Sequence, residues 1–80
     1  MISIQLALFA KFSSRYPVGG SGREPRPFDV AADTTVGQVV HAIGLDGEPR
    51  ITFVNGRHAA DDRVLREGDR LALFPPVAGG

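Results

Sequence analysis

The first nine residues alternate between apolar positions and polar or small ones. The apolar side chains fall on every second position and share one face: Ile2, Ile4, Leu6 and Leu8. The positions between them form the other face: Ser3, Gln5 and Ala7. A period of two is typical of a strand that is buried on one side only. We therefore predict a half-buried first strand over residues 1–9.

Four shorter segments downstream are also predicted to be strands. They cover residues 28–31, 50–55, 57–59 and 70–74. The first of them forms a hairpin with the opening strand. The Asn55-Gly56 pair is a strong signal for a tight turn, so the short segment after it is a return strand. Gly68 and Asp69 turn the chain into the last strand.

One clear helix follows the second strand. Thr35 is a good N-cap, and Gln38 three residues later completes a capping-box pattern. The next apolar residues repeat at i, i+3, i+4 and i+7 and form one stripe: Val36, Val39, Val40 and Ile43. Gly44 supplies a left-handed stop, and Leu45 is placed to fold back on the last turn. The stripe predicts a short helix that packs on a sheet.

Two segments lie between these elements. Residues 10–26 are rich in Ser, Gly and Pro, which predicts a long, mobile connection with little to bury. Asp61 or Asp62 is predicted to cap a single helical turn through Val64 and Leu65. The order of elements predicts an α+β fold of two layers, in which one main helix covers one face of a mixed sheet of four to five strands.

Composition narrows the possible functions. The 80 residues make one small domain, too short for a deep catalytic pocket. Nine basic and nine acidic residues give a formal net charge of zero, which argues against a protein that binds nucleic acid or a membrane surface. The absence of Cys excludes a disulfide scaffold, a Cys-based metal site and a thiol nucleophile. No apolar stretch is long enough for a transmembrane helix, so we expect a cytoplasmic monomer.

The end of the sequence is its most informative feature. After Phe74, the last strand passes through Pro75 and Pro76 into a tail that ends in Gly79 and Gly80. The prolines hold the backbone extended and offer no N–H group to a sheet. The glycines lack a Cβ atom, so a terminal carboxylate could enter a channel too narrow for other residues. A terminal Gly pair can arise by chance, but the spacer and the strand favour a chain that works through its own carboxylate.

Three segments match the motifs of a known family. The most specific is the run from Leu65 to Phe74 with the Pro-Pro-Val-Ala-Gly-Gly end behind it. The Val-Asn-Gly turn at 54–56 and the Thr-Val pair that opens the helix also match. Together they resemble the ubiquitin-like β-grasp sulfur carriers, above all the small subunit of molybdopterin synthase, with the thiamine-pathway carrier more distant. The loop over 10–26 is longer, and the helix shorter, than in typical molybdopterin members.

The resemblance implies how the chain is used. A β-grasp domain over residues 1–75 would carry a flexible tail over residues 76–80. A ubiquitin-activating-like partner would use ATP to adenylate the terminal carboxylate of Gly80, and a persulfide sulfur donor would convert the acyl-adenylate to a thiocarboxylate. The tail residues that would thread the partner's channel are Val77, Ala78 and Gly79. The carrier would bind no cofactor and would be a co-substrate, not an enzyme.

Strand parity predicts an apolar patch beside the tail, independently of the family. The residues that face away from the core on the first, third and last strands are Ala7, Phe9, Phe53, Ala72 and Phe74. If these strands are neighbours, the three Phe side chains meet, and such a patch on a small domain usually binds a protein. His58, just after the Asn-Gly turn, is counted with this docking surface. The alternative is that a Phe closes an edge of the core.

The other candidate sites are weaker. His41 and His58 have no third ligand converging on them, so we expect no metal site and place both on the surface. Residues 19–22 are rich in Gly but lack the Gly-Lys-Ser/Thr signature of a phosphate loop, which favours a flexible connection. The balanced charge disfavours an anionic or RNA partner for the loop residues Arg15, Tyr16, Arg23 and Arg26. Asp61 and Asp62 are predicted to be a cap and not a catalytic pair.

We therefore predict a sulfur carrier for molybdopterin biosynthesis. It would dock first on an adenylating enzyme and then on a larger synthase subunit, with Gly80 as the thiocarboxylate. One alternative is a ubiquitin-like modifier joined to Lys side chains of target proteins through the same terminus. The tail cannot separate these two functions because both begin with adenylation. Further alternatives are a carrier for thiamine or another sulfur metabolite, and a module that only binds a partner.

Overall fold

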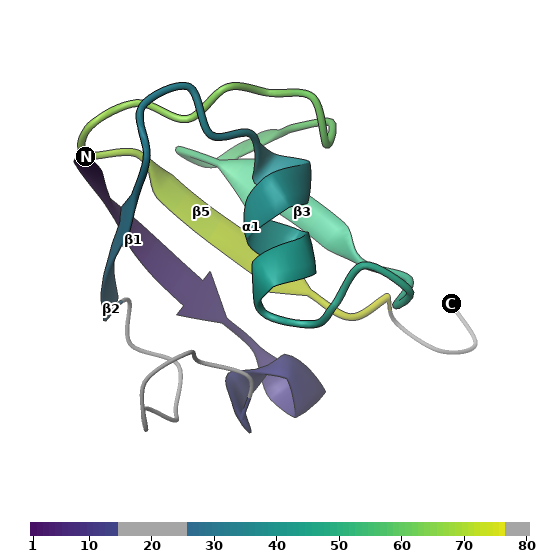
Figure 1. Ribbon diagram of the computed structural model, residues 1–80. Helices are drawn as coiled ribbons and strands as arrows, with labels where there is room; N and C mark the ends of the chain where they lie inside the picture. The colour runs from purple at the N-terminus through teal and green to yellow at the C-terminus, as the bar shows by residue number, and fades with distance from the viewer. Residues whose placement is uncertain (15–25, 77–80) are drawn as a thin grey trace.

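A five-stranded mixed sheet and one helix form the two layers of the protein (Figure 1). The structure is a computed structural model that describes residues 1–14 and 26–76. The elements, in chain order, are β1 (Ile2–Leu8), the 3-10 helix η1 (Ala10–Ser14), β2 (Arg26–Val30), α1 (Val36–Ala42), β3 (Ile51–Val54), β4 (Arg57–His58) and β5 (Arg70–Phe74). All five predicted strands and the predicted helix are present, with ends that lie within two residues of the predicted ones. The fold is a ubiquitin-like β-grasp.

The sheet has the strand order β2-β1-β5-β3-β4. The two central strands, β1 and β5, run parallel, and every other pair is antiparallel. In Figure 1, α1 crosses the face formed by β1, β5 and β3. The strands that carry the predicted outward Phe side chains are therefore neighbours, as the parity argument required.

The core lies between α1 and this face of the sheet. Its buried members are Ile4, Leu6, Leu8, Phe12, Val30, Val36, Val39, Val40, Ile43, Leu45, Val54, Leu65, Leu71 and Leu73. Ile4, Leu6 and Leu8 of β1 and the whole predicted stripe of α1 belong to it, and Ile2 is partly buried against it. Because burial of apolar area is the main driving force of folding, the period of two in β1 and the helical period in α1 each specify the buried face.

Both ends of α1 have the predicted caps. The backbone N–H of Gln38 donates to Oγ1 of Thr35 over 3.3 Å, and the backbone N–H of Thr35 donates to Oε1 of Gln38 over 2.8 Å. At the other end Gly44 has a φ of 80°. The N–H of Leu45 then donates to the carbonyl of Val40 over 2.9 Å, the long bond of a Schellman motif.

The predicted helical turn at residues 61–65 is wrong. This segment, which we call the strap, lies against the start of α1. The backbone carbonyls of Arg63 and Asp61 accept hydrogen bonds from the N–H groups of Val36 and Gly37, over 2.9 and 2.8 Å respectively. The first N–H groups of a helix have no partner within the helix, and the strap satisfies two of them. A Cβ atom on Gly37 would come within 3.2 Å of Asp61, so the close approach depends on glycine there.

The prediction for the connection after β1 is wrong in its first part. Residues 10–14 form η1, and the side chain of Phe12 is 1% exposed and belongs to the core. A single aromatic side chain in a segment rich in Ser and Gly is enough to hold a turn on the core. The predicted mobility of the rest of the loop concerns residues 15–25, which lie outside the described residues. Within 1–14 and 26–76, no helix has the length and apolar character needed to cross a membrane.

Candidate functional site

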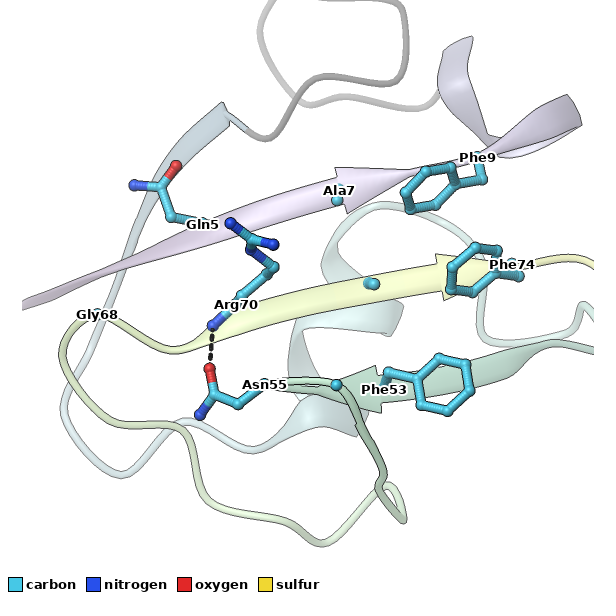
Figure 2. A pocket seen from close by; sticks show the side chains of 10 residues that line it. Gln5, Ala7, Phe9, Phe53, Asn55, Gly68, Arg70 and Phe74 are labelled. Atoms are coloured by element: carbon cyan, nitrogen blue, oxygen red, sulfur yellow. Dashed lines mark hydrogen bonds between the residues drawn. The ribbon is translucent and has the colours of Figure 1, made fainter.

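The three Phe side chains on the outer face of the sheet are in contact. The rings of Phe9 and Phe74 are stacked, with centroids 4.3 Å apart and planes 7° from parallel. Phe53 meets Phe74 edge-on, with the centroids 5.7 Å apart. We call these three side chains the aromatic cluster; Figure 2 shows them at one end of the outer face. All three are half-buried and none belongs to the helix-side core.

His58 extends the aromatic cluster toward the sheet edge. It is the cross-strand partner of Phe53, and its ring meets the Phe53 ring edge-on with the centroids 4.6 Å apart. His58 itself is exposed. The structure thus brings together the four predicted docking residues, Phe9, Phe53, His58 and Phe74. Their role in docking stays a prediction.

The outer face is hollow next to the aromatic cluster. Ala7 and Ala72 lie on this face, as predicted, and they are only 2% and 9% exposed. They form the floor of an open hollow of about 840 Å³. Its lining residues are Gln5, Ala7, Phe9, Phe53, Asn55, Gly56, Gly68, Arg70, Ala72 and Phe74 (Figure 2). A face that combines a small-residue floor with aromatic walls can accept a protruding apolar side chain.

A buried carboxylate organises the other end of the hollow. Asp69 is 7% exposed and accepts hydrogen bonds from Nδ2 of Asn55 and from the backbone N–H of Arg66, both at 2.9 Å. The guanidinium of Arg63 lies 3.5 Å from the same carboxylate. Asn55, with a φ of 54°, begins the predicted tight turn. The sequence analysis missed this network, although its two turn signals, Asn-Gly and Gly-Asp, mark both partners.

The remaining candidates are surface contacts. His41 lies off the apolar stripe and places Nδ1 3.0 Å from Oδ2 of Asp46; this hydrogen bond is the main cause that lowers the pKa of Asp46 below its ordinary value. Oδ2 of Asp61 lies 2.7 Å from Nη2 of the Arg50 guanidinium. Among residues 1–14 and 26–76, no three His, Cys, Asp or Glu side chains could hold a metal ion.

The predicted reactive residues follow directly after the aromatic cluster in the chain. Phe74 is the last residue of β5, and only Pro75 separates it from the predicted tail over residues 76–80. The predicted tail residues Val77, Ala78, Gly79 and Gly80 lie outside the described residues. So do the Gly-rich segment 19–22 and the loop residues Arg15, Tyr16 and Arg23.

Comparison with known proteins defines the class. The model of the ThiS family matches residues 22–80, which is most of the chain and includes the whole tail. The protein therefore belongs to the ThiS family of β-grasp sulfur carriers. Carriers of this family are small non-catalytic proteins that bind no cofactor, and the family implies an adenylating partner related to ubiquitin-activating enzymes.

Individual relatives sharpen the comparison. The chain is 40% identical over 67 residues to small archaeal modifier protein 1 of Haloferax volcanii, covering 65% of this chain and 77% of the relative. The crystal structure of that modifier has a TM-score of 0.73 at 30% identity, covering 96% of this chain and all of the other. The structure of a molybdopterin converting factor subunit 1 assigned in Pyrococcus furiosus has a TM-score of 0.75 at 20% identity, covering 96% of this chain and 100% of the other, which shows the shared fold.

Proposed function

We propose that this chain is a sulfur carrier of the molybdopterin-synthase small-subunit type. One observation carries the proposal: β5 ends in Phe74, inside the aromatic cluster on the outer face, and the Pro-Pro-Val-Ala-Gly-Gly segment begins at the next residue. A surface suited to binding a protein and a tail of mostly small residues thus adjoin each other in the chain. The β-grasp domain over residues 1–75 would place the tail over 76–80 in a partner's active site.

The chemistry would take place at Gly80. A carboxylate is a poor electrophile, so the adenylating partner would transfer AMP from ATP to the Gly80 carboxylate and release pyrophosphate. The persulfide sulfur of a donor would then attack the acyl carbon, and AMP would leave. A thiol would release the thiocarboxylate by thiol–disulfide exchange. Val77, Ala78 and Gly79 would occupy the channel, where bulky side chains would block access.

Docking would use the aromatic cluster and His58. Buried aromatic side chains are enriched among the residues that dominate binding energy in protein interfaces. Phe74 is the central anchor, because it contacts both Phe9 and Phe53 and precedes the tail. The same surface would engage the adenylating enzyme and then the larger synthase subunit. The two complexes would therefore exclude one another, so that the carrier leaves the first enzyme before it donates sulfur in the cytoplasm.

A second function is a ubiquitin-like modifier. The observation that favours it is the 40% identity to a protein named small archaeal modifier protein 1. In this function a target Lys amine would attack the activated Gly80 carbonyl and form an isopeptide bond. The two functions share adenylation and differ in the nucleophile that follows. A carrier for thiamine or another sulfur metabolite would share the sulfur step and differ only in the acceptor.

The mass of the intact chain, isolated from its native cells, separates these functions. A sulfur carrier shows the mass gain of one oxygen replaced by sulfur, located at Gly80 by fragmentation. A modifier shows adducts in which Gly80 is joined to a Lys of another protein. Loss of the molybdenum cofactor on deletion of the gene supports the molybdopterin function, and loss of thiamine instead contradicts it. An unmodified terminus under all growth conditions overturns both functions.

A further inference from the structure

The side chains on the outer face of the sheet change from aromatic to polar along the strands. The register pairs Gln5 with Arg70, and Ala7 with Ala72, on the two central strands. The aromatic cluster lies at the end nearest the tail, the two alanines lie in the middle, and the polar side chains of Gln5, Asn55 and Arg70 lie at the far end (Figure 2). Phe74 and Arg70 are four residues apart on β5, which corresponds to about 13 Å along a strand.

Arg70 is the one charged residue among those that line the hollow. Lys11, Arg50 and Arg63 each have a carboxylate within 4.0 Å, whereas no ion pair of Arg70 occurs within residues 1–14 and 26–76. The neighbouring carboxylate of Asp69 is buried and already bound by Asn55 and Arg66. The hollow therefore presents a positive charge that the described part of the chain does not neutralise.

The backbone of Arg70 is fixed from both sides. Its N–H donates to Oδ1 of Asn55 over 2.9 Å, and its carbonyl accepts from the backbone N–H of Asn55, also over 2.9 Å. Asn55 is held in turn by the buried Asp69. A guanidinium on a fixed backbone loses less conformational entropy on binding than one on a mobile loop. The fixed backbone therefore favours a role for Arg70 in recognising a partner over a general contribution to solubility.

We propose that Arg70 recognises a carboxylate on the adenylating partner, and that this carboxylate belongs to a segment whose apolar side chain enters the hollow against the aromatic cluster. Arg matches the two oxygens of a carboxylate with paired N–H donors. The aromatic cluster would supply affinity, and Arg70 would set the register that delivers the tail to the active site. This inference rests on the proposed function because it assumes an adenylating partner.

The test compares carrier variants in ATP–pyrophosphate exchange catalysed by the adenylating enzyme of the same organism, with carrier concentration varied. Arg70→Gln keeps the backbone hydrogen bonds and removes the charge, and Arg70→Glu reverses it. We expect KM for the carrier to rise about 10-fold for Arg70→Gln and about 100-fold for Arg70→Glu, with kcat within about two-fold of wild type. Added salt should raise KM of wild type more steeply than KM of Arg70→Gln.

Arg57→Glu is the matched control. Arg57 is an exposed Arg on β4 with no ion pair in the described ranges, and it does not line the hollow. Its cross-strand partner Val54 is in the core, so Arg57 points to the opposite side of the sheet from the hollow. Arg57→Glu changes the net charge by the same amount as Arg70→Glu. For this control the KM for the carrier should stay within about two-fold of wild type.

Three outcomes would overturn the role of Arg70. They are an unchanged KM for folded Arg70→Glu, an equal rise in KM for Arg57→Glu, and a rise in KM for ATP in place of KM for the carrier. Thermal melts establish folding, and Arg70→Gln decides the question if Arg70→Glu does not fold. Failure of the proposed function gives a different result, because a chain lacking Gly80 would then support undiminished exchange.

Discussion

Adjacent residues of β5 belong to two surfaces with different compositions. Leu73 points to the helix and is fully buried, whereas Phe74 lies on the outer face and is half-buried. The helix side is filled mainly by aliphatic side chains packed between two layers. Within residues 1–14 and 26–76, no second layer covers the outer side, which carries aromatic rings, two alanines and one arginine. The comparison indicates that one face provides stability, and that the other remains available for a partner.

The largest expected effect comes from changes in the tail. Deletion of Gly80, or Gly79→Ala with Gly80 kept, should abolish adenylation, because the reacting carboxylate is displaced or the channel is blocked. Since glycine has no side chain to bury, stability should change by less than about 0.5 kcal/mol. ATP–pyrophosphate exchange and a thermal melt measure the two effects. Undiminished exchange by the deletion variant would contradict the carrier function.

Two Phe residues three positions apart test the division between the faces. Phe12 is 1% exposed and in the core, whereas Phe9 is half-buried on the outer face. Phe12→Ala should lower the free energy of unfolding by about 3–5 kcal/mol, and Phe9→Ala by about 1 kcal/mol. Urea denaturation followed by circular dichroism gives both values. Equal losses would mean that the outer face contributes as much to folding as the core does.

A third prediction concerns binding through Phe74. Phe74→Arg should weaken binding to the adenylating partner by about 2 kcal/mol or more, because it removes the central anchor of the aromatic cluster. Its effect on the free energy of unfolding should be clearly smaller than its effect on binding. Titration calorimetry with the partner and a denaturant curve measure the two quantities. An unfolded Phe74→Arg variant would show that Phe74 acts as core.

The smallest expected effect is the pH dependence of the exposed pair His41–Asp46. The pKa of Asp46 is lowered in the folded protein, mainly by the hydrogen bond with His41. A lowered pKa stabilises the fold above the ordinary value of 3.8, and this contribution disappears as the pH falls through the folded-state pKa. Asp46→Asn should therefore lower the Tm slightly at pH 5, and the difference should narrow below pH 3.8. A constant difference down to pH 2 would contradict this linkage.

Strand and helix patterns alone were sufficient to predict the architecture. Each element has a local signal: a period of two in β1, an apolar stripe and a capping box in α1, and the Asn55-Gly56 pair at the turn. Each element is present at the residues that carry its signal. Parity along the strands also predicted which Phe side chains face outward. Parity depends only on the alternation of side chains along a strand, so it needs no knowledge of distant contacts.

The errors have a common physical cause. Phe12 was assigned to a mobile loop because its neighbours are Ser and Gly, yet the nearby core accepts its ring. Asp61 was assigned to a helical cap, yet its segment satisfies the free N–H groups of α1 through its backbone. The burial of Phe12 and the hydrogen bonds of the Asp61 segment both depend on which part of the fold lies next to each segment. A local sequence pattern does not contain that information.

The sequence by itself predicted the strands, the main helix and the buried face of β1 and of α1, because these depend on residue periodicity and on residue type. Only the tertiary structure decided that β1 and β5 lie side by side in parallel. That pairing stacks Phe9 on Phe74 and places Arg70 in the same hollow. Contacts between segments more than 60 residues apart depend on how the whole chain folds, so the aromatic cluster and the hollow beside it exist only in the folded protein.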